Sequence, residues 1–196
     1  MISSDVFRRP NKPSSMAIKV RSEHELTTSK YSNEVVFVDK YTECHVTPID
    51  VAGRMVKYAS PLGDVLEPSA GTGNIVQALL EYGISPEQIT SVEKHTDLAS
   101  RLKKRFDNKV AVFNQCFLQF AQEIEMRFDT IIMNPPFRPI KHHVEAAQTL
   151  LKNNGRIILL SPVSFEKEDF TLIEELHEHT FATTKVKTHI LEYQKD

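Results

Sequence analysis

The sequence predicts one α/β domain, built on a doubly wound, mostly parallel sheet of about seven strands with helices on both faces. The first observation behind this prediction is that short apolar runs alternate with segments whose apolar residues recur every three or four positions. The second is a Gly-rich turn that directly follows one of these runs. Strands that alternate with helices pair in parallel through right-handed crossovers, so the expected arrangement is Rossmann-like.

The N-terminal stretch differs from the rest of the chain. Residues 1–44 contain Pro10, Pro13 and many Ser and Thr residues without clear periodicity, so we expect an arm or irregular lead-in. A short strand at 33–40 is the one element expected there. The folded domain is predicted to span residues 45–196.

The first half of the domain is predicted from its periodicity. Residues 74–82 place Ile75, Leu79 and Tyr82 on one helix face, and 97–106 place apolar residues at four-residue intervals. The elements expected in this half are a helix at 48–59, a strand at 64–70, a helix at 74–82, a strand at 89–94 and a helix at 97–106.

The second half continues the alternation. Strands are expected at 110–114, 128–134 and 155–162, with a helix at 144–155 between the last two. The Asn154-Gly155 pair is interpreted as the C-terminal stop of that helix. A further helix at 168–179 and a strand at 184–193 are expected to complete the domain.

Composition excludes several classes of protein. A formal net charge of -2 and a pI near 6.5 exclude a polycation, so any contact with nucleic acid has to use a local basic surface. Cys44 and Cys116 lie far apart and lack the spacing of a metal site or a disulfide framework. Proteins without disulfides are typical of the reducing cytosol. No apolar run approaches the roughly 20 residues that span a bilayer, so a cytoplasmic protein without a membrane partner is expected.

The Gly-rich turn "EPSAGTGN" places Gly71 and Gly73 between a strand and a helix, where a ligand can approach backbone N–H groups. A phosphate-binding P-loop needs Lys and Ser or Thr after the last glycine, whereas Asn74 and Ile75 follow here. A dinucleotide fingerprint needs a third glycine where Val76 stands. Both nucleotide-phosphate interpretations are therefore disfavoured.

Two acidic residues end neighbouring strands, Glu67 before the glycine turn and Glu93 in "SVEK". Ligands of such sheets bind at the carboxyl edge, where Glu93 is suited to accept two ribose hydroxyls. Glu67 favours an ammonium or sulfonium group over a pyrophosphate, because like charges repel.

The strand at 128–134 ends abruptly in Asn134-Pro135-Pro136-Phe137. Two prolines remove two backbone donors and fix two φ angles, so the carbonyl groups of this turn are held rigidly. Rigid acceptors beside an aromatic ring indicate a recognition device.

Together, "VLEPSAGTGNI", "VEK" and "NPPF" resemble, in order and spacing, the class I S-adenosylmethionine-dependent methyltransferases, specifically those that methylate adenine N6. The upstream fragment "HVTPIDVAGRMVKYA" is similar to the Thr-Pro element that precedes the glycine turn in one arrangement of DNA adenine methyltransferases. The resemblance covers residues from about 45 to 162. It implies S-adenosylmethionine as cofactor, no metal, and a cofactor site formed by Thr47, Pro48, Glu67, Pro68, Ala70, Gly71, Gly73, Glu93, Lys94, Cys116 and Phe117.

The sequence departs from the family at one position. The family usually has an Asp-Phe pair after its third strand, with the Asp accepting from the adenine amine of the cofactor, whereas Cys116-Phe117 stands here. Phe117 remains able to stack on the ring, and Asn114 or a backbone carbonyl is a candidate replacement for the acceptor.

The resemblance also implies the chemistry of the tetrapeptide. The Asn134 side-chain oxygen and the Pro135 carbonyl would accept from an exocyclic amine and return electron density to its nitrogen, while Phe137 stacks on the base. DNA adenine N6 is the expected acceptor, with short, relaxed or partner-supplied specificity, since little chain follows Pro162. The alternatives are an RNA base amine (adenine N6 or guanine N2), a protein glutamine, and an inactive subunit that binds nucleic acid or a partner. The sequence predicts no oligomeric state.

Basic residues are candidate contacts to nucleic-acid phosphates: Arg8 and Arg9 in the arm, and Arg138 and Lys141 after the tetrapeptide. The histidine pairs His142-His143 and His177/His179 lack a matching acid or cysteine cluster. We therefore expect exposed helix residues rather than metal ligands.

Overall fold

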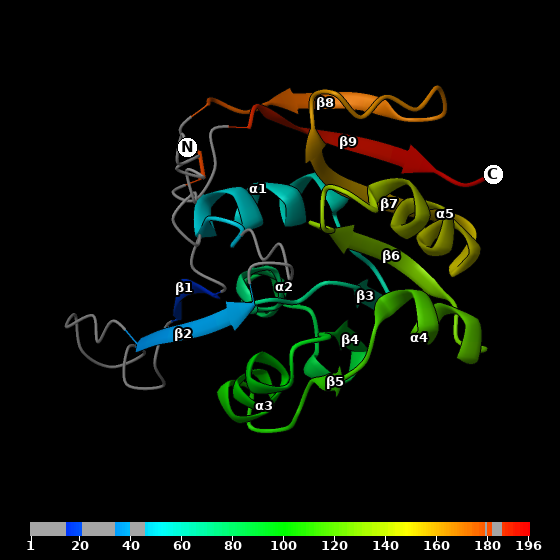
Figure 1. Ribbon diagram of the computed structural model, residues 1–196. Helices are drawn as coiled ribbons and strands as arrows, with labels where there is room; N and C mark the ends of the chain where they lie inside the picture. The colour runs from blue at the N-terminus through cyan, green and yellow to red at the C-terminus, as the bar shows by residue number, and fades with distance from the viewer. Residues whose placement is uncertain (1–14, 21–33, 40–45, 179, 182–185) are drawn as a thin grey trace, which may run out of the picture.

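Seven strands form one sheet in the spatial order β5-β4-β3-β6-β7-β9-β8 (Figure 1). The first five of these pair in parallel, and β9 runs antiparallel between β7 and β8. The predicted α/β domain with a mostly parallel seven-stranded sheet is confirmed. The strands are β3 (Val65–Glu67), β4 (Ile89–Val92), β5 (Ala111–Phe113), β6 (Phe128–Met133), β7 (Leu151–Pro162), β8 (Thr171–Glu175) and β9 (Thr188–Gln194).

The computed structural model describes residues 15–20, 34–39, 46–178, 180, 181 and 186–196. The N-terminal pieces, β1 (Ser15–Val20) and β2 (Glu34–Asp39), pair antiparallel in a sheet of their own. The expected strand at 33–40 is therefore β2, whereas β1 lies where no element was expected. Arg8 and Arg9 lie outside the described residues.

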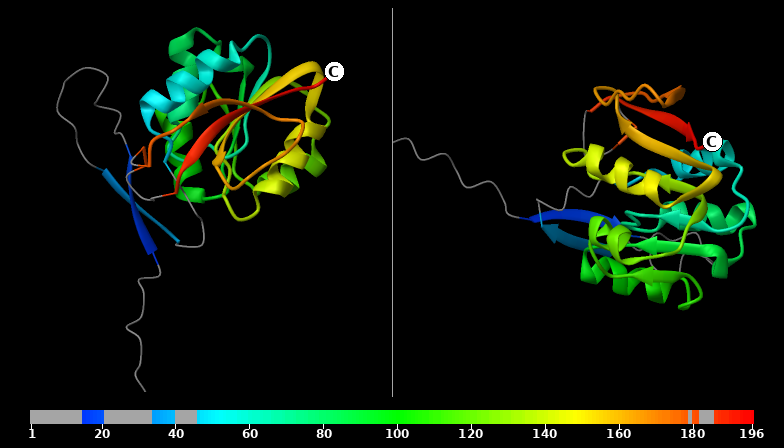
Figure 2. Two further views of the ribbon diagram at one scale, coloured as in Figure 1. Left: turned by 90° about the horizontal axis from the view of Figure 1, so that it is seen from above. Right: turned by 90° about the vertical axis from the view of Figure 1, so that its right-hand side faces the viewer.

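Helices cover both faces of the large sheet, and Figure 2 shows α1 and α5 on opposite sides of it. One apolar core joins the sheet to α1, α2 and α3, and the other joins it to α4 and α5. In α1 the buried residues recur at three- and four-residue spacing, which gives the helix one apolar face. The helices are α1 (Ile49–Ala59), α2 (Asn74–Tyr82), α3 (Thr96–Arg105), α4 (Phe117–Glu123) and α5 (Ile140–Thr149), with a 3-10 turn at Pro86–Gln88.

The predicted helix at 168–179 is wrong, because the chain there forms β8 and pairs with β9. The backbone N–H and C=O groups of β9 thereby form hydrogen bonds with β8 as well as with β7. Side chains also connect β8 to α1. Arg54 on α1 makes an ion pair with Glu174 at 2.9 Å, and the Tyr58 hydroxyl donates to the same carboxylate at 2.9 Å.

The predicted helix at 144–155 has the wrong bounds. The helix α5 begins at Ile140 and ends at Thr149, and the Asn154-Gly155 pair lies inside β7 instead of ending the helix. Asn154 has a φ of 61°, and a Cβ on Gly155 would lie 2.9 Å from the Lys152 carbonyl oxygen. The pair therefore forms a tight irregularity where β7 enters the sheet.

Tyr82 is 47% exposed, so it does not complete the buried face of α2 with Ile75 and Leu79. No helix was predicted at α4.

Candidate active site

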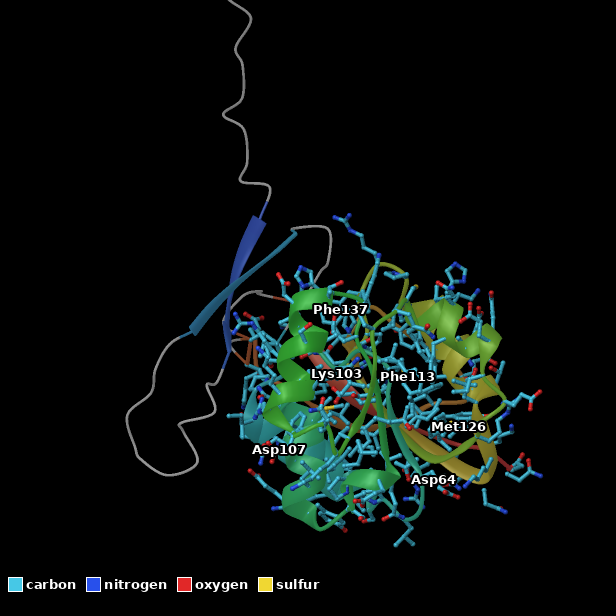
Figure 3. The ribbon with its side chains drawn as sticks, turned by 90° about the horizontal axis from the view of Figure 1, so that it is seen from below. Asp64, Lys103, Asp107, Phe113, Met126 and Phe137 are labelled. Atoms are coloured by element: carbon cyan, nitrogen blue, oxygen red, sulfur yellow. The ribbon has the colours of Figure 1, made fainter. Side chains whose placement is uncertain are left out.

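A pocket of about 370 Å³ opens where β3, β4, β5 and β6 end, a volume in the range of small-molecule sites. Figure 3 labels Phe137, which follows β6, and Asp64, which precedes β3. The two lie at opposite ends of the parallel strands, Phe137 at the carboxyl end and Asp64 at the amino end. Many of the residues predicted for the site line this pocket: Thr47, Glu67, Pro68, Ala70, Gly71, Glu93, Lys94, Cys116, Phe117, Asn134, Pro136 and Arg138.

The remaining predicted residues surround the lining. Pro48, Gly73, Pro135 and Phe137 are chain neighbours of lining residues, and Lys141 lies in the first turn of α5. Because the ends of four parallel strands meet at one edge, residues from five separate segments of the chain converge here.

The turn between β3 and α2 is fixed by its glycines and by contacts to neighbouring elements. Gly71 and Gly73 have φ angles of 53° and 83°, in the left-handed region that favours glycine. A Cβ on Gly73 would lie 2.5 Å from a methyl carbon of Leu102 on α3. The Arg105 guanidinium donates to the Thr72 carbonyl oxygen at 2.7 Å. The turn is therefore packed too closely on α3 to accept a larger residue at position 73.

Glu93, at the end of β4, links the glycine turn to the start of α3. Its carboxylate accepts hydrogen bonds at 2.7 Å from the backbone N–H groups of Gly71 and His95. Burial raises the pKa of Glu93, and these two hydrogen bonds act in the opposite direction. Each carboxylate oxygen retains acceptor capacity beyond one such bond. The arrangement is therefore compatible with further donors such as ribose hydroxyls.

Glu67, at the end of β3, is a buried acid, only 2% exposed. Burial raises the pKa of Glu67 well above its usual value, and the nearby Glu93 acts in the same direction. Among the described residues no group donates to its Oε2 atom. A buried acceptor on the pocket wall matches the ammonium or sulfonium group of S-adenosylmethionine, so the residues present fit this cofactor.

Asn134 and Thr47 join the turn after β6 to the segment before α1. Both side chains are buried, and Asn134 Nδ2 donates to Thr47 Oγ1 at 3.0 Å. Asn74, the first residue of α2, donates to the Thr47 carbonyl oxygen at 2.8 Å. Thr47 therefore connects the Asn-Pro-Pro-Phe turn to the helix that follows the glycine turn, and the hydrogen bond to Thr47 sets the orientation of the Asn134 amide.

The pocket is also lined by Cys116, Phe117 and a residue that we did not predict for the site, His143. His143 is 7% exposed, so the expectation of an exposed helix residue is wrong at this position. Its ring centroid lies 5.7 Å from that of Phe117. The sequence contained a signal for this position, because Ile140, His143, Val144 and Ala147 form the apolar face of α5.

The other candidate positions have simpler surroundings. Asn114 donates from Nδ2 to the carbonyl oxygens of Glu93 (2.9 Å) and Lys94 (3.1 Å), and so stabilises the turn after β4. His142 is exposed as expected, whereas His177 is exposed but lies after β8 rather than in a helix. His179 lies outside the described residues.

Two basic residues lie at or near the pocket. Arg138 lines the pocket and is exposed, and Lys141 on α5 is also exposed.

Within the described part of the chain, no three His, Cys, Asp or Glu side chains are grouped as metal ligands. No helix there combines the length and apolarity that crossing a bilayer requires.

Comparison with known proteins agrees with this geometry. The family model "Methyltransferase small domain" matches residues 31–192. Two relatives are each named tRNA1(Val) (adenine(37)-N6)-methyltransferase. The one from Flavobacterium psychrophilum is 23% identical, over 84% of this chain and 75% of that protein. The one from Flavobacterium johnsoniae is 26% identical, over 63% of each chain.

A solved structure supports the fold. The crystal structure of the 23S rRNA methyltransferase ErmE matches with a TM-score of 0.66 at 18% identity, over 78% of this chain and 70% of that chain. With the family model matching most of the chain, this protein belongs to the methyltransferase small domain family and is a class I methyltransferase that uses S-adenosylmethionine.

Proposed function

We propose that the protein transfers a methyl group from S-adenosylmethionine to N6 of an adenine in RNA, with tRNA as the substrate class. The observation that carries the proposal is the buried hydrogen bond from Asn134 to Thr47, which holds the Asn-Pro-Pro-Phe turn at the cofactor pocket. Two relatives with tRNA adenine-N6 methyltransferase names favour RNA over the DNA acceptor expected from the sequence.

In this proposal the pocket residues hold the cofactor along the edge of the sheet. The Glu67 carboxyl group, which has an oxygen without a donor among the described residues, binds a cationic group of the methionine part. Glu93 accepts from the ribose hydroxyls, and the Gly71 backbone is held against it at 2.7 Å. Phe117 packs against the adenine. When bound, S-adenosylmethionine supplies an electrophilic methyl group on a sulfonium.

The turn after β6 then acts on the acceptor amine. The lone pair of an exocyclic amine is delocalised into the ring, which makes the nitrogen a poor nucleophile. Asn134 Oδ1 and the Pro135 carbonyl accept from its two hydrogens and favour the tetrahedral nitrogen. Methyl transfer would form the N–C bond as the C–S bond breaks, and the resulting cationic amine would give up one proton to water. The step requires orientation rather than a covalent enzyme intermediate.

Two further features support a nucleic-acid acceptor. Phe137 follows the acceptor carbonyl and is suited to stack on an extruded base. Arg138 and Lys141 are exposed beside the turn and are suited to phosphates, together with Arg8 and Arg9 of the arm.

The test is methyl transfer from labelled S-adenosylmethionine to three separate acceptors: unmodified tRNA, DNA duplexes and single strands, and cell protein. Labelled nucleic acid is digested to nucleosides. N6-methyladenosine from tRNA, lost in Asn134→Ala, supports the proposal. Label in N6-methyldeoxyadenosine, in N2-methylguanosine or in glutamine assigns a different acceptor. Cofactor binding with no transfer to any acceptor supports the inactive subunit.

A further inference from the structure

His143 lies where the family pattern is incomplete. The resemblance predicts an Asp that accepts from the adenine amine of the cofactor, and this chain has Cys116 at that position. A thiol is only a weak acceptor. His143 lines the same pocket as Cys116 although it comes from α5, which is distant in sequence. A stronger acceptor is therefore present in this pocket, beside Phe117, the residue that follows Cys116.

The hydrogen bond of His143 determines which ring nitrogen accepts. Its Nδ1 atom lies 3.2 Å from the Pro139 carbonyl oxygen, the acceptor at the start of α5. A carbonyl oxygen can only accept, so Nδ1 carries the hydrogen. A neutral imidazole has one N–H group, so Nε2 is then an acceptor.

The Nε2 atom is available to a ligand. The hydrogen bond of the described His143 ring is made by Nδ1, and Nε2 is not among the fully buried polar atoms that lack a partner, so it keeps some exposure although the side chain as a whole is only 7% exposed. Burial lowers the pKa of His143, with His142 acting in the same direction and the Pro139 carbonyl opposing it. The ring is therefore neutral near pH 7, which leaves the Nε2 lone pair in place.

The order of the strands indicates which part of the cofactor would lie near Phe117 and His143. Glu67 is the last residue of β3, and Glu93 directly follows β4, the next strand toward β5. With the methionine part at Glu67 and the ribose at Glu93, the adenine extends toward the loop after β5, which carries Cys116 and Phe117. The Phe117 ring lies 5.7 Å from the ring of His143.

We propose that His143 accepts a hydrogen bond through Nε2 from the 6-amino group of the cofactor's adenine. The inference rests on the proposed cofactor site and adds a residue that the family pattern does not contain. His143 selects and positions the cofactor and takes no part in the transfer step. It would recognise a 6-amino purine over a purine that lacks the amine.

The test compares two ligands by calorimetry, S-adenosylhomocysteine and its analogue with hydrogen in place of the 6-amino group. One neutral hydrogen bond predicts about three- to tenfold tighter binding of the amino compound by the wild type. In His143→Phe, which retains an aromatic ring beside Phe117, this ratio should fall to about one. His143→Gln, whose amide oxygen can accept, should retain part of the ratio. His142→Phe is the matched control, because His142 is exposed, and should leave the ratio unchanged.

The outcomes separate this inference from the proposed function. If the wild type binds neither ligand, the cofactor site itself is refuted. If it binds both equally, or if His143→Phe retains the wild-type ratio, only the role of His143 is refuted. Should His143→Phe fail to fold, imidazole ¹⁵N spectra of the wild type decide. A shift of the His143 Nε2 resonance with the amino ligand and not with its analogue supports the role, and identical spectra refute it.

Discussion

Asn134 Nδ2 donates to Thr47 Oγ1 at 3.0 Å, across 87 residues of chain. Thr47 precedes α1 and Asn134 follows β6, so the bond joins the Asn-Pro-Pro-Phe turn to the segment that precedes the first helix of the domain. An amide has its donor and acceptor on opposite sides, so engaging Nδ2 also sets the direction of Oδ1.

Replacing Asn134 by Ala should remove an acceptor that acts in the transition state. We expect kcat to fall about 10²- to 10³-fold, as for loss of one preorganised hydrogen-bonding group. The dissociation constant of S-adenosylmethionine should change little, as measured by calorimetry. Equal loss of binding and turnover would mean that Asn134 is structural.

Replacing Thr47 by Val should misorient Asn134 without removing it. The side chain keeps its shape but loses the hydroxyl, so we expect kcat to fall about tenfold, which corresponds to one buried hydrogen bond. Thr47→Ser keeps the hydroxyl and should restore most of the rate. If Val and Ser variants lose activity equally, packing rather than the hydrogen bond explains the role of Thr47.

Replacing Glu67 by Gln should stabilise the ligand-free protein and weaken cofactor binding. The pKa of Glu67 is raised in the folded state, so the unfolded chain ionises first as pH rises. Stability is therefore lost progressively above the unfolded pKa, about 4.3, until the folded pKa is reached. The wild-type melting temperature should fall with pH across this interval, and Glu67→Gln should reduce the fall.

The same acid predicts proton release on cofactor binding. A cation beside Glu67 lowers its pKa, so affinity for S-adenosylmethionine should rise with pH until Glu67 is ionised in the free protein. Calorimetry in buffers of different ionisation enthalpy measures the protons released. The effect should be absent in Glu67→Gln, and its persistence there would assign the proton to another group.

Replacing Gly73 by Ala should destabilise the protein and weaken the cofactor site. The residue has a φ of 83°, and its Cβ would lie 2.5 Å from a Leu102 methyl carbon. Overpacking of this kind costs about 1–3 kcal/mol. Gly53→Ala is the matched control. Gly53 lies inside α1, and apart from its own helix backbone no atom lies within 4 Å of an added Cβ. The free energy of unfolding of Gly53→Ala should therefore rise by about 0.5–1 kcal/mol. Urea unfolding of both variants measures the difference.

Replacing Arg138 or Lys141 by Ala should flatten the salt dependence of RNA binding. Each phosphate contact that is lost reduces the slope of log K against log salt by about 0.7 for a single strand. Lys109 precedes β5, so it lies at the amino ends of the parallel strands, away from the pocket at their carboxyl ends. Lys109→Ala is therefore the control and should leave the slope unchanged. A slope that is also unchanged in Arg138→Ala and Lys141→Ala would place the RNA elsewhere.

The sequence by itself determined the fold class and the ends of the central strands. Short apolar runs specify buried parallel strands, and residues that directly follow such runs must meet at one sheet edge. Glu67, Glu93 and Asn134 could therefore be assigned to one site without a structure. The glycine turn was also readable, because glycines between a strand and a helix indicate the left-handed backbone that Gly71 and Gly73 adopt.

Tertiary structure decided what depends on contacts between distant segments. Residues 171–175 have a pattern that also suits a helix, and they become β8 because β9 offers a partner edge and Arg54 and Tyr58 bind Glu174. His143 is buried because α5 packs it against Phe117, a contact that local spacing only suggests. The bond from Thr47 to Asn134 exists only once β6 and the segment before α1 are adjacent, since hydrogen bonds over such a separation require the folded sheet.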